Sequence, residues 1–363
     1  MKLRQKLYKK QKYKKRLDKV TMKTRSIDIF CQVIDNFGDI GVCYRLYKEL
    51  SSLFPETSIR LLLDKTEEFF ALCSEYQEIS YKTYAEIEAE KESVETAEVI
   101  IEAFACEIPD NYLQKAYHNS KLIVNLEYFS AEDWTEDFHL QESILGIGTC
   151  RKFFFMPGIS KKTGGILTKA YYPNLSLQDF GITREDYDLV GSIFSYEKNF
   201  TSLFESLQKI GKRVCLCILG EKSQESVRKS LGNFKRYDRI ELKFLPFYSQ
   251  ENYEALIQKC DFNFVRGEDS FARALLTGKP FLWHIYPQEN DLHFQKLQSF
   301  LEKYCPENKA LQNTFFSYNR EETDYSYFWE HFKEIREQNE EFRDYIQKHC
   351  NLGIKLKQFI ENF

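Results

Sequence analysis

The sequence predicts an α/β protein built from two successive parallel-sheet domains that face each other across a ligand cleft. Short apolar segments with the length and β-branched content of buried strands alternate with helical patterns along the chain. A loose segment at residues 172–188 divides this alternation into two halves and marks the candidate linker. In both halves polar residues follow the strands, at the position where open α/β sheets bind their ligands.

The first predicted strand, residues 27–34, stops abruptly at Asp35 and Asn36. A helical pattern follows from near Asp39, which can serve as the N-cap. Asp35 lies just past the carboxyl end of the strand, which is a position for chemistry. The alternative is that Asp35 and Asn36 form only an Asx turn and that Asp39 only caps the helix.

The remainder of the first half continues the alternation, with a helix predicted to begin near Pro109. Further strands are predicted at residues 58–63, 98–104, 121–126 and 151–156. Asn125, Glu127 and Tyr128 again follow the end of a strand. We therefore expect these three side chains to lie on the same rim as Asp35.

The second half starts at a strand predicted over residues 189–194. Further strands are predicted at residues 212–219, 240–245, 260–265 and 280–286, with helices at 250–259 and from about 271 to 277. Neither half has Gly-x-Gly-x-x-Gly at its first turn, and there is no P-loop. These absences argue against a dinucleotide oxidoreductase and a nucleoside triphosphatase.

The segment from Arg266 to Ser270 has the features of a phosphate site. Asp269 and Ser270 are predicted to begin a helix whose free backbone amides and positive dipole end bind anions. Arg266 adds a bidentate donor, and Gly267 permits close backbone approach. A diphosphate is the expected ligand. Alternatively, Asp269 or Ser270 only caps the helix and Arg266 pairs with a nearby acid.

Aromatic residues at strand ends of the second half could stack on a nucleobase, or they could belong to the core. They are Phe194, Tyr196 and Phe247.

Composition restricts the class of protein. At 363 residues the chain is long enough for two full domains, and 43% hydrophobic with 29% charged residues is ordinary for a soluble protein. No apolar stretch approaches the roughly 18 residues that span a bilayer. The scattered cysteines fit a reducing cytoplasm, and no zinc-ligand spacing is present. We therefore expect a cytoplasmic protein with no structural metal.

The start of the chain differs from the rest. Residues 1–21 contain ten Lys or Arg and one Asp, so we expect residues 1–25 to form a disordered basic tail. Such a tail can attract an acidic protein or nucleic acid. We favour a simpler interpretation, in which the tail precedes a possible start at Met22 and has no role in the folded protein.

Five motifs together resemble the bacterial elongation factor P arginine rhamnosyltransferases. They are Asp35-Asn36-Phe37-Gly38-Asp39-Ile40-Gly41-Val42, Asn125-Leu126-Glu127-Tyr128, Phe153-Phe154-Phe155-Met156-Pro157-Gly158, Arg266-Gly267-Glu268-Asp269-Ser270-Phe271 and Trp283-His284-Ile285-Tyr286-Pro287-Gln288. The resemblance runs from about Ile27 to Leu301. Several motifs in the same order are far more specific than any one of them.

The resemblance implies a GT-B glycosyltransferase with two Rossmann-like domains. Residues 26–180 would bind the acceptor, residues 181–344 the nucleotide sugar, and a helix at about 345–363 would pack back on the first domain. The implied reaction transfers L-rhamnose from TDP-β-L-rhamnose to an arginine of elongation factor P, with inversion and without a metal or cofactor. This modification supports translation of polyproline stretches. No membrane and no direct nucleic-acid partner are expected.

The resemblance also implies roles for individual residues. The family's catalytic carboxylates fall on Asp35, Asp39 and Glu268. Its donor contacts fall on Phe194, Tyr196, Gln250, Arg266, Asp269 and Ser270.

Two other classes of function remain open. One is a GT-B enzyme that uses another nucleotide sugar or acceptor. The other is a non-catalytic nucleotide-binding or partner-docking protein, which the intact Asp35, Asp39 and Glu268 disfavour.

We predict that residues 1–21 are dispensable. A chain that begins at Met22 should modify its acceptor as fast as the full chain, because the tail has few core-forming residues and much like charge. Turnover of the two chains at low and high salt is the measurement. A large loss on truncation that salt reproduces in the full chain would instead mean that the tail steers binding.

Overall fold

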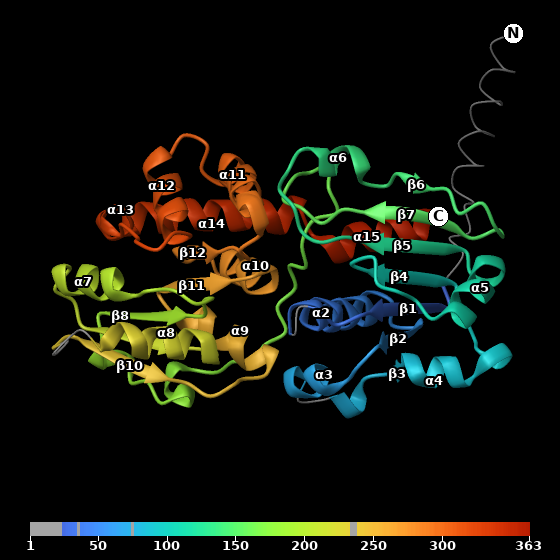
Figure 1. The fold of residues 1–363 in the computed structure, drawn as a ribbon, viewed down its shortest axis with the longest axis horizontal. Coiled ribbons are helices and arrows are strands. Elements are labelled where there is room, and N and C mark those ends of the chain that lie inside the picture. The colour runs from blue at the N-terminus through green and yellow to red at the C-terminus, as the bar shows by residue number, and fades with distance from the viewer. Residues whose placement is uncertain (1–23, 35–36, 74–75, 233–237) are drawn as a thin grey trace, which may run out of the picture.

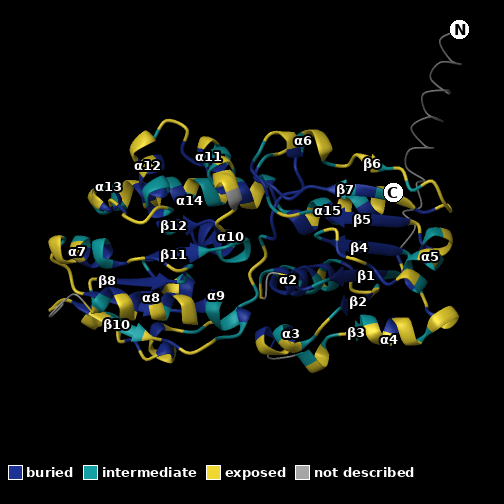
Figure 2. Ribbon diagram, viewed as in Figure 1, coloured by how far each residue is buried: buried dark blue, intermediate teal, exposed yellow. Residues whose placement is uncertain are grey.

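The structure, a computed structural model, describes residues 24–34, 37–73, 76–232 and 238–363. Within these ranges the chain forms two mainly parallel sheets, each flanked by helices, which lie side by side (Figure 1). The strands of both sheets are largely buried (Figure 2). The predicted α/β fold with two Rossmann-like domains is confirmed. Of the predicted basic tail, residues 1–25, the structure describes only Thr24 and Arg25.

The first sheet has seven strands among the described residues, in the order β3-β2-β1-β4-β5-β7-β6. Their bounds are β1 (Ser26–Cys31), β2 (Ser58–Leu63), β3 (Tyr81–Thr83), β4 (Val99–Ala103), β5 (Leu122–Leu126), β6 (Glu142–Ser143) and β7 (Arg151–Phe155). β6 runs antiparallel to β7, and the other neighbours pair in parallel. The strands β3 and β6 were not predicted, because two or three residues are too short for a periodic pattern.

The first strand ends at Cys31, earlier than the predicted Ile34. Two carboxylates explain the early end of this strand. The backbone N–H of Val33 donates to Asp64 at 2.9 Å, and that of Ile34 donates to Asp39 at 2.9 Å. These bonds replace the strand ladder and turn the chain into the loop before the next helix.

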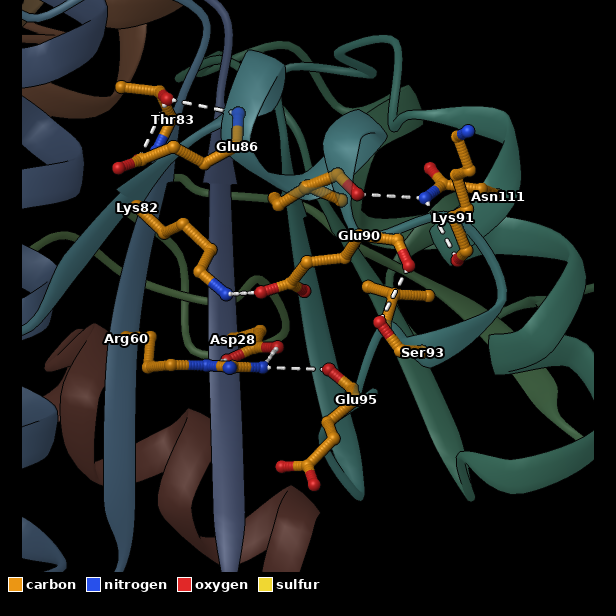
Figure 3. Close-up of polar contacts among 12 residues, drawn as sticks. Asp28, Arg60, Lys82, Thr83, Glu86, Glu90, Lys91, Ser93, Glu95 and Asn111 are labelled. Atoms are coloured by element: carbon orange, nitrogen blue, oxygen red, sulfur yellow. Dashed lines mark hydrogen bonds and ion pairs between the residues drawn. The ribbon is translucent and has the colours of Figure 1, made fainter.

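The first core follows the alternation of side chains along β1. Ile27 and Ile29 pack on one face, and Phe30 packs on the other. The buried carboxylate of Asp28 shares the second face and is held by Arg60 of β2 through two bonds of 2.8 and 2.6 Å (Figure 3). This pair lies within one domain, so its role is structural.

The second sheet has five strands in the described chain, all parallel, in the order β10-β9-β8-β11-β12. Their bounds are β8 (Leu189–Ile193), β9 (Val214–Ile218), β10 (Ile240–Phe244), β11 (Phe262–Arg266) and β12 (Phe281–His284). All five correspond to predicted segments. The carboxyl ends of β8, β11 and β12 therefore lie at one edge of this sheet.

Helices flank both sheets. In the first domain they are α2 (Phe37–Leu53), α3 (Glu67–Leu72), α4 (Tyr84–Ala89), α5 (Asp110–Asn119) and α6 (Trp134–Phe138). With the second sheet lie α7 (Thr201–Lys209), α8 (Glu221–Leu231), α9 (Gln250–Lys259), α10 (Glu268–Thr277), α11 (Leu292–Tyr304), α12 (Lys309–Tyr318), α13 (Ser326–Glu330) and α14 (Phe332–His349). No helix in the described ranges is long and apolar enough to cross a bilayer.

The chain ends on the first domain. After α14 the helix α15 (Leu352–Asn362) lies beside the first sheet (Figure 1). Its buried residues Leu352, Leu356 and Ile360 join the core that α2 covers. A backbone bridge between Ile166 and Asn351 fixes the point of return. The two domains are therefore joined by two chain crossings.

Candidate active site

A cavity of about 320 Å³ lies between the two domains, near the carboxyl ends of both sheets. The first domain contributes the start of α2 and the segments after β4 and β5. The second contributes the loop after β8, the start of α10 and the segment after β12. The lining residues are Ile34, Gly38, Asp39, Val42, Phe104, Tyr128, Phe129, Ser130, Ala131, Tyr196, Gly267, Glu268, Asp269, Trp283, Ile285, Tyr286, Gln288 and Lys296.

Asp39 is the carboxylate that the first domain contributes from α2. The helix begins at Phe37, so Asp39 lies within the first turn and is not the N-cap that the sequence predicted. Its side chain is 2% exposed and accepts hydrogen bonds from the backbone of Ile34 (2.9 Å) and the hydroxyl of Tyr128 (3.2 Å). The free amides and dipole of the first turn favour a negative charge there. These contacts hold the carboxylate at the cavity wall in one orientation.

Tyr128 is itself positioned by Phe104. The two rings stack with centroids 4.3 Å apart and an interplanar angle of 16°. Phe104 has φ of +59°, a left-handed backbone conformation that bulky residues rarely adopt. The sequence predicted Tyr128 at the strand ends that line the cleft. It predicted Phe104 only as the last residue of a strand, because a left-handed backbone leaves no sequence pattern.

Glu268 is the carboxylate that the second domain contributes. It is the first residue of α10, which begins a little earlier than predicted. Its Oε2 accepts a hydrogen bond of 3.1 Å from the backbone N–H of Phe129, so it bridges the cleft. The preceding Gly267 has φ of +61°, and a Cβ there would lie 3.3 Å from the hydroxyl of Tyr196. Glycine is therefore required by the turn that aims α10 at the cavity.

Arg266 lies at the end of β11 beside two of the predicted aromatic contacts. Its guanidinium carbon is 4.4 Å from the ring centroid of Phe194 and 5.0 Å from that of Tyr196. It also donates to the carbonyl of Ser195 at 3.4 Å. Arg266 and Phe194 are not part of the cavity lining, but the ring of Tyr196, which Arg266 contacts, does line the cavity.

The loop that carries Tyr196 is held by three serines of α8. The backbone N–H groups of Ser195, Lys198 and Phe200 donate to Ser223 (2.7 Å), Ser226 (3.2 Å) and Ser230 (2.9 Å) respectively. All three hydroxyls are buried, so they satisfy N–H groups that water cannot reach. Sequence reasoning missed these serines, although their spacing at 223, 226 and 230 places them on one helix face.

His284, at the end of β12, also supports this loop. Its Nδ1 lies 2.7 Å from the hydroxyl of Ser195. Burial, with the positive charges of Lys198 and Arg266, lowers the pKa of His284 to about 3. The imidazole is therefore neutral at neutral pH and acts in positioning. Beside it, the indole N–H of Trp283 donates to the carbonyl of Gly267 at 2.8 Å and fixes the turn before α10.

Gln250 and Asp269 lie where the domains meet. Gln250, the first residue of α9, donates through Nε2 to the carbonyl of Gly41 on α2 at 2.8 Å and to Asp269 at 3.4 Å. Asp269 also forms ion pairs with Arg45 (3.5 Å) and Arg273 (3.7 Å). Ser270 follows in the same first turn of α10 and is partly buried.

The structure therefore brings Asp39, Tyr196, Glu268 and Asp269 to one cavity. Of the other predicted site residues, Arg266 and Phe194 lie beside it, Ser270 follows Asp269 in α10, and Gln250 lies at the domain junction. Asp35 lies outside the described residues. The chemical roles of all these residues stay predictions.

Comparison with known proteins identifies relatives along almost the whole chain. The family model described as elongation factor P (EF-P) rhamnosyltransferase EarP matches residues 27–361, well beyond the resemblance read from the motifs. A protein-arginine rhamnosyltransferase of Pseudomonas aeruginosa is 34% identical over 309 residues, covering 77% of this chain and 82% of the relative. A corresponding enzyme of Neisseria meningitidis is 32% identical over 308 residues, covering 77% and 80%.

Solved structures share the fold. One, described as the structural basis for EarP-mediated arginine glycosylation of translation elongation factor EF-P, has a TM-score of 0.63 at 22% identity and covers 93% of this chain and 99% of its own. Spinosyn rhamnosyltransferase SpnG has a TM-score of 0.56 at 10% identity, with 93% and 100% covered. These likenesses establish a glycosyltransferase fold of two Rossmann-like domains.

Proposed function

Because the chain belongs to the EarP family of EF-P rhamnosyltransferases, we propose that it transfers L-rhamnose from TDP-β-L-rhamnose to an arginine of elongation factor P. The observation that carries this proposal is a single cavity lined by Asp39 of one domain and by the first turn of α10 of the other. That arrangement supplies an acceptor carboxylate and an anion site across one space. Modification of EF-P would in turn support translation of polyproline stretches.

The acceptor sets the first chemical requirement. A guanidinium has a pKa above about 12 and delocalised lone pairs, so it is a poor nucleophile. A carboxylate can grip the planar group through two N–H bonds and orient one nitrogen toward the anomeric carbon. In this proposal Asp39, with Asp35, grips the arginine and accepts the proton that this nitrogen loses as the C–N bond forms.

The leaving group sets the second requirement. As the bond between the anomeric carbon and the phosphate oxygen breaks, the diphosphate leaves with the electron pair and gains negative charge. The free N–H groups and dipole of α10, together with Arg266, can stabilise that charge. Glu268 adds a second carboxylate from the donor side of the cavity.

We also propose that the transfer inverts the configuration at the anomeric carbon. A single displacement needs the nucleophile and the leaving group on opposite sides of the anomeric carbon. In this proposal the acceptor carboxylate is Asp39 of the first domain and the phosphate site is the first turn of α10 of the second, and both line the same cavity. This arrangement supports one-step transfer from the β-linked donor to an α-linked product.

Transfer is tested with the purified chain, elongation factor P and TDP-rhamnose. We expect tandem mass spectrometry to locate one deoxyhexose on an arginine, and none when lysine replaces that arginine. Transfer from another nucleotide sugar but not from TDP-rhamnose would favour the alternative enzyme. A melting temperature raised by TDP without transfer to any acceptor would indicate a non-catalytic nucleotide-binding protein.

We further propose that transfer is independent of metal. Positive charge for the leaving diphosphate is already available from α10 and Arg266, so a chelator should leave the rate unchanged. The measurement is the initial rate of transfer with EDTA, followed by added magnesium. Activity that EDTA abolishes and magnesium restores would contradict this proposal.

A further inference from the structure

A fully buried arginine, Arg45 of α2, joins the two domains outside the cavity lining. Its side chain is 0% exposed and pairs with two acids of the second domain. Its Nη1 lies 2.6 Å from Glu254 of α9, and its Nε lies 3.5 Å from Asp269 of α10. The proposed chemistry assigns Arg45 no task, yet a buried charge is costly unless it is paired.

A second buried arginine lies near the same two acids. Arg273 of α10 lies 3.7 Å from both Glu254 and Asp269, and it donates to the carbonyl of Leu167. Burial opposes the charge of Arg45, but Asp269 and Glu254 outweigh this effect and its pKa stays above the ordinary value. Burial and the charge of Arg45 instead lower the pKa of Arg273. Glu254 lies 2.6 Å from Arg45 but 3.7 Å from Arg273, so Arg45 is the cation that this acid holds more closely.

One face of α2 makes the junction. Gly41, Tyr44, Arg45 and Lys48 of this helix contact α9 or α10, and their spacing of three, one and three residues places them on a single stripe of the helix. Tyr44 and Lys48 bind Glu251 at 2.8 and 2.5 Å, and Gly41 accepts the amide of Gln250. A Cβ at Gly41 would lie 3.0 Å from that amide nitrogen, so glycine lets α9 approach closely.

We propose that Arg45 is a positioning residue for the transfer, which sets the spacing between Asp39 and the first turn of α10. This inference rests on the proposed function. Asp39 precedes Arg45 by six residues on the same helix, or about 9 Å along its axis. On the other side Asp269 adjoins Glu268 in the first turn of α10. The Arg45–Asp269 pair thus links the two walls through short, rigid helical segments, and transfer rates are sensitive to such spacing.

The first test is Arg45→Met, which keeps most of the unbranched apolar stem of the side chain and removes its charge. We expect kcat to fall at least tenfold while the KM for TDP-rhamnose changes less than about threefold, because Arg273 still pairs with Asp269 and the amides of α10 stay in place. Arg45→Lys should restore part of kcat, since it returns a charge but not both contacts. The matched control is Arg60→Met, which breaks the Asp28–Arg60 pair within the first domain (Figure 3). It should lower the melting temperature but leave kcat unchanged at temperatures where the protein is folded.

A second variant avoids the risk of unfolding. In Gly41→Ala the better helix former favours α2, while the added methyl displaces the amide of Gln250. We expect the melting temperature to stay at or above that of the wild type and kcat to fall severalfold. Wild-type kcat in both Gly41→Ala and folded Arg45→Met would overturn the proposal.

Hydrogen exchange separates this inference from the proposed function. Amides in α2 and in the first turn of α10 should exchange faster in Arg45→Met than in the wild type, and not in Arg60→Met. This readout needs no acceptor. A wild-type chain that transfers no rhamnose would refute the function, whereas unchanged exchange in Arg45→Met would refute the role of Arg45 in holding the junction.

Discussion

Transfer to elongation factor P should collapse in Asp39→Asn, by at least about a hundredfold in kcat. The substitution keeps the size of the side chain and its capacity to accept from the backbone of Ile34. It removes the charge that, in the proposed mechanism, grips the guanidinium and accepts its proton. The initial rate of rhamnose incorporation, measured at saturating donor and acceptor, is the readout.

Asp64→Asn is the matched control for this variant. Asp64 follows β2 and accepts a hydrogen bond of 2.9 Å from Val33, in the same loop that Asp39 supports through Ile34. It does not line the cavity. Near-normal turnover in Asp64→Asn would show that loop support alone does not explain the loss. Near-normal turnover in Asp39→Asn would mean that this carboxylate is not essential.

Donor binding should weaken most in Arg266→Ala. Charge-assisted bonds to phosphate contribute about 1.5 to 3 kcal/mol, so the dissociation constant for TDP-rhamnose should rise roughly 10- to 150-fold. Ser270→Ala removes a neutral donor and should cost less, about 0.5 to 1.5 kcal/mol. Calorimetric titration of each variant with TDP-rhamnose measures both effects.

Arg228→Ala controls for the loss of a stacked arginine. Arg228 of α8 lies 4.4 Å from the ring of Phe244, as Arg266 lies 4.4 Å from that of Phe194, but on an exposed surface away from the cavity. Its removal should leave donor affinity unchanged. Equal losses in Arg228→Ala and Arg266→Ala would indicate a general effect on the domain rather than a phosphate contact.

The sequence predicts the parts of this site that local signals encode. A buried strand followed by turn residues and a helical pattern locates the loops around Asp39 and Arg266, because strand ends and helix starts depend on neighbouring residues. The helix starts were off by one or two residues, since Asp39 and Asp269 are residue types that favour the N-cap position but lie within the first turn of their helices. The roles of Asp39 and Glu268 came from the family resemblance.

The parts that could not be predicted depend on contacts between distant segments. Arg45 and Arg273 are ordinary helix residues in sequence. Both acids of Arg45 lie on the facing domain, and Arg273 reaches Glu254 on another helix as well as Asp269 on its own. The left-handed backbone of Phe104 likewise has no local signature. Tertiary packing creates these features, so the structure is needed to find them.

We propose that acceptor chemistry and donor binding belong to opposite walls of one cavity. Titration of TDP-rhamnose into Asp39→Asn is the decisive measurement, because Asp39 belongs to the first domain and the proposed phosphate site to the second. We expect a dissociation constant within about fivefold of the wild type, or about 1 kcal/mol, in a variant that no longer transfers rhamnose. A loss of donor affinity as severe as that of Arg266→Ala would contradict it.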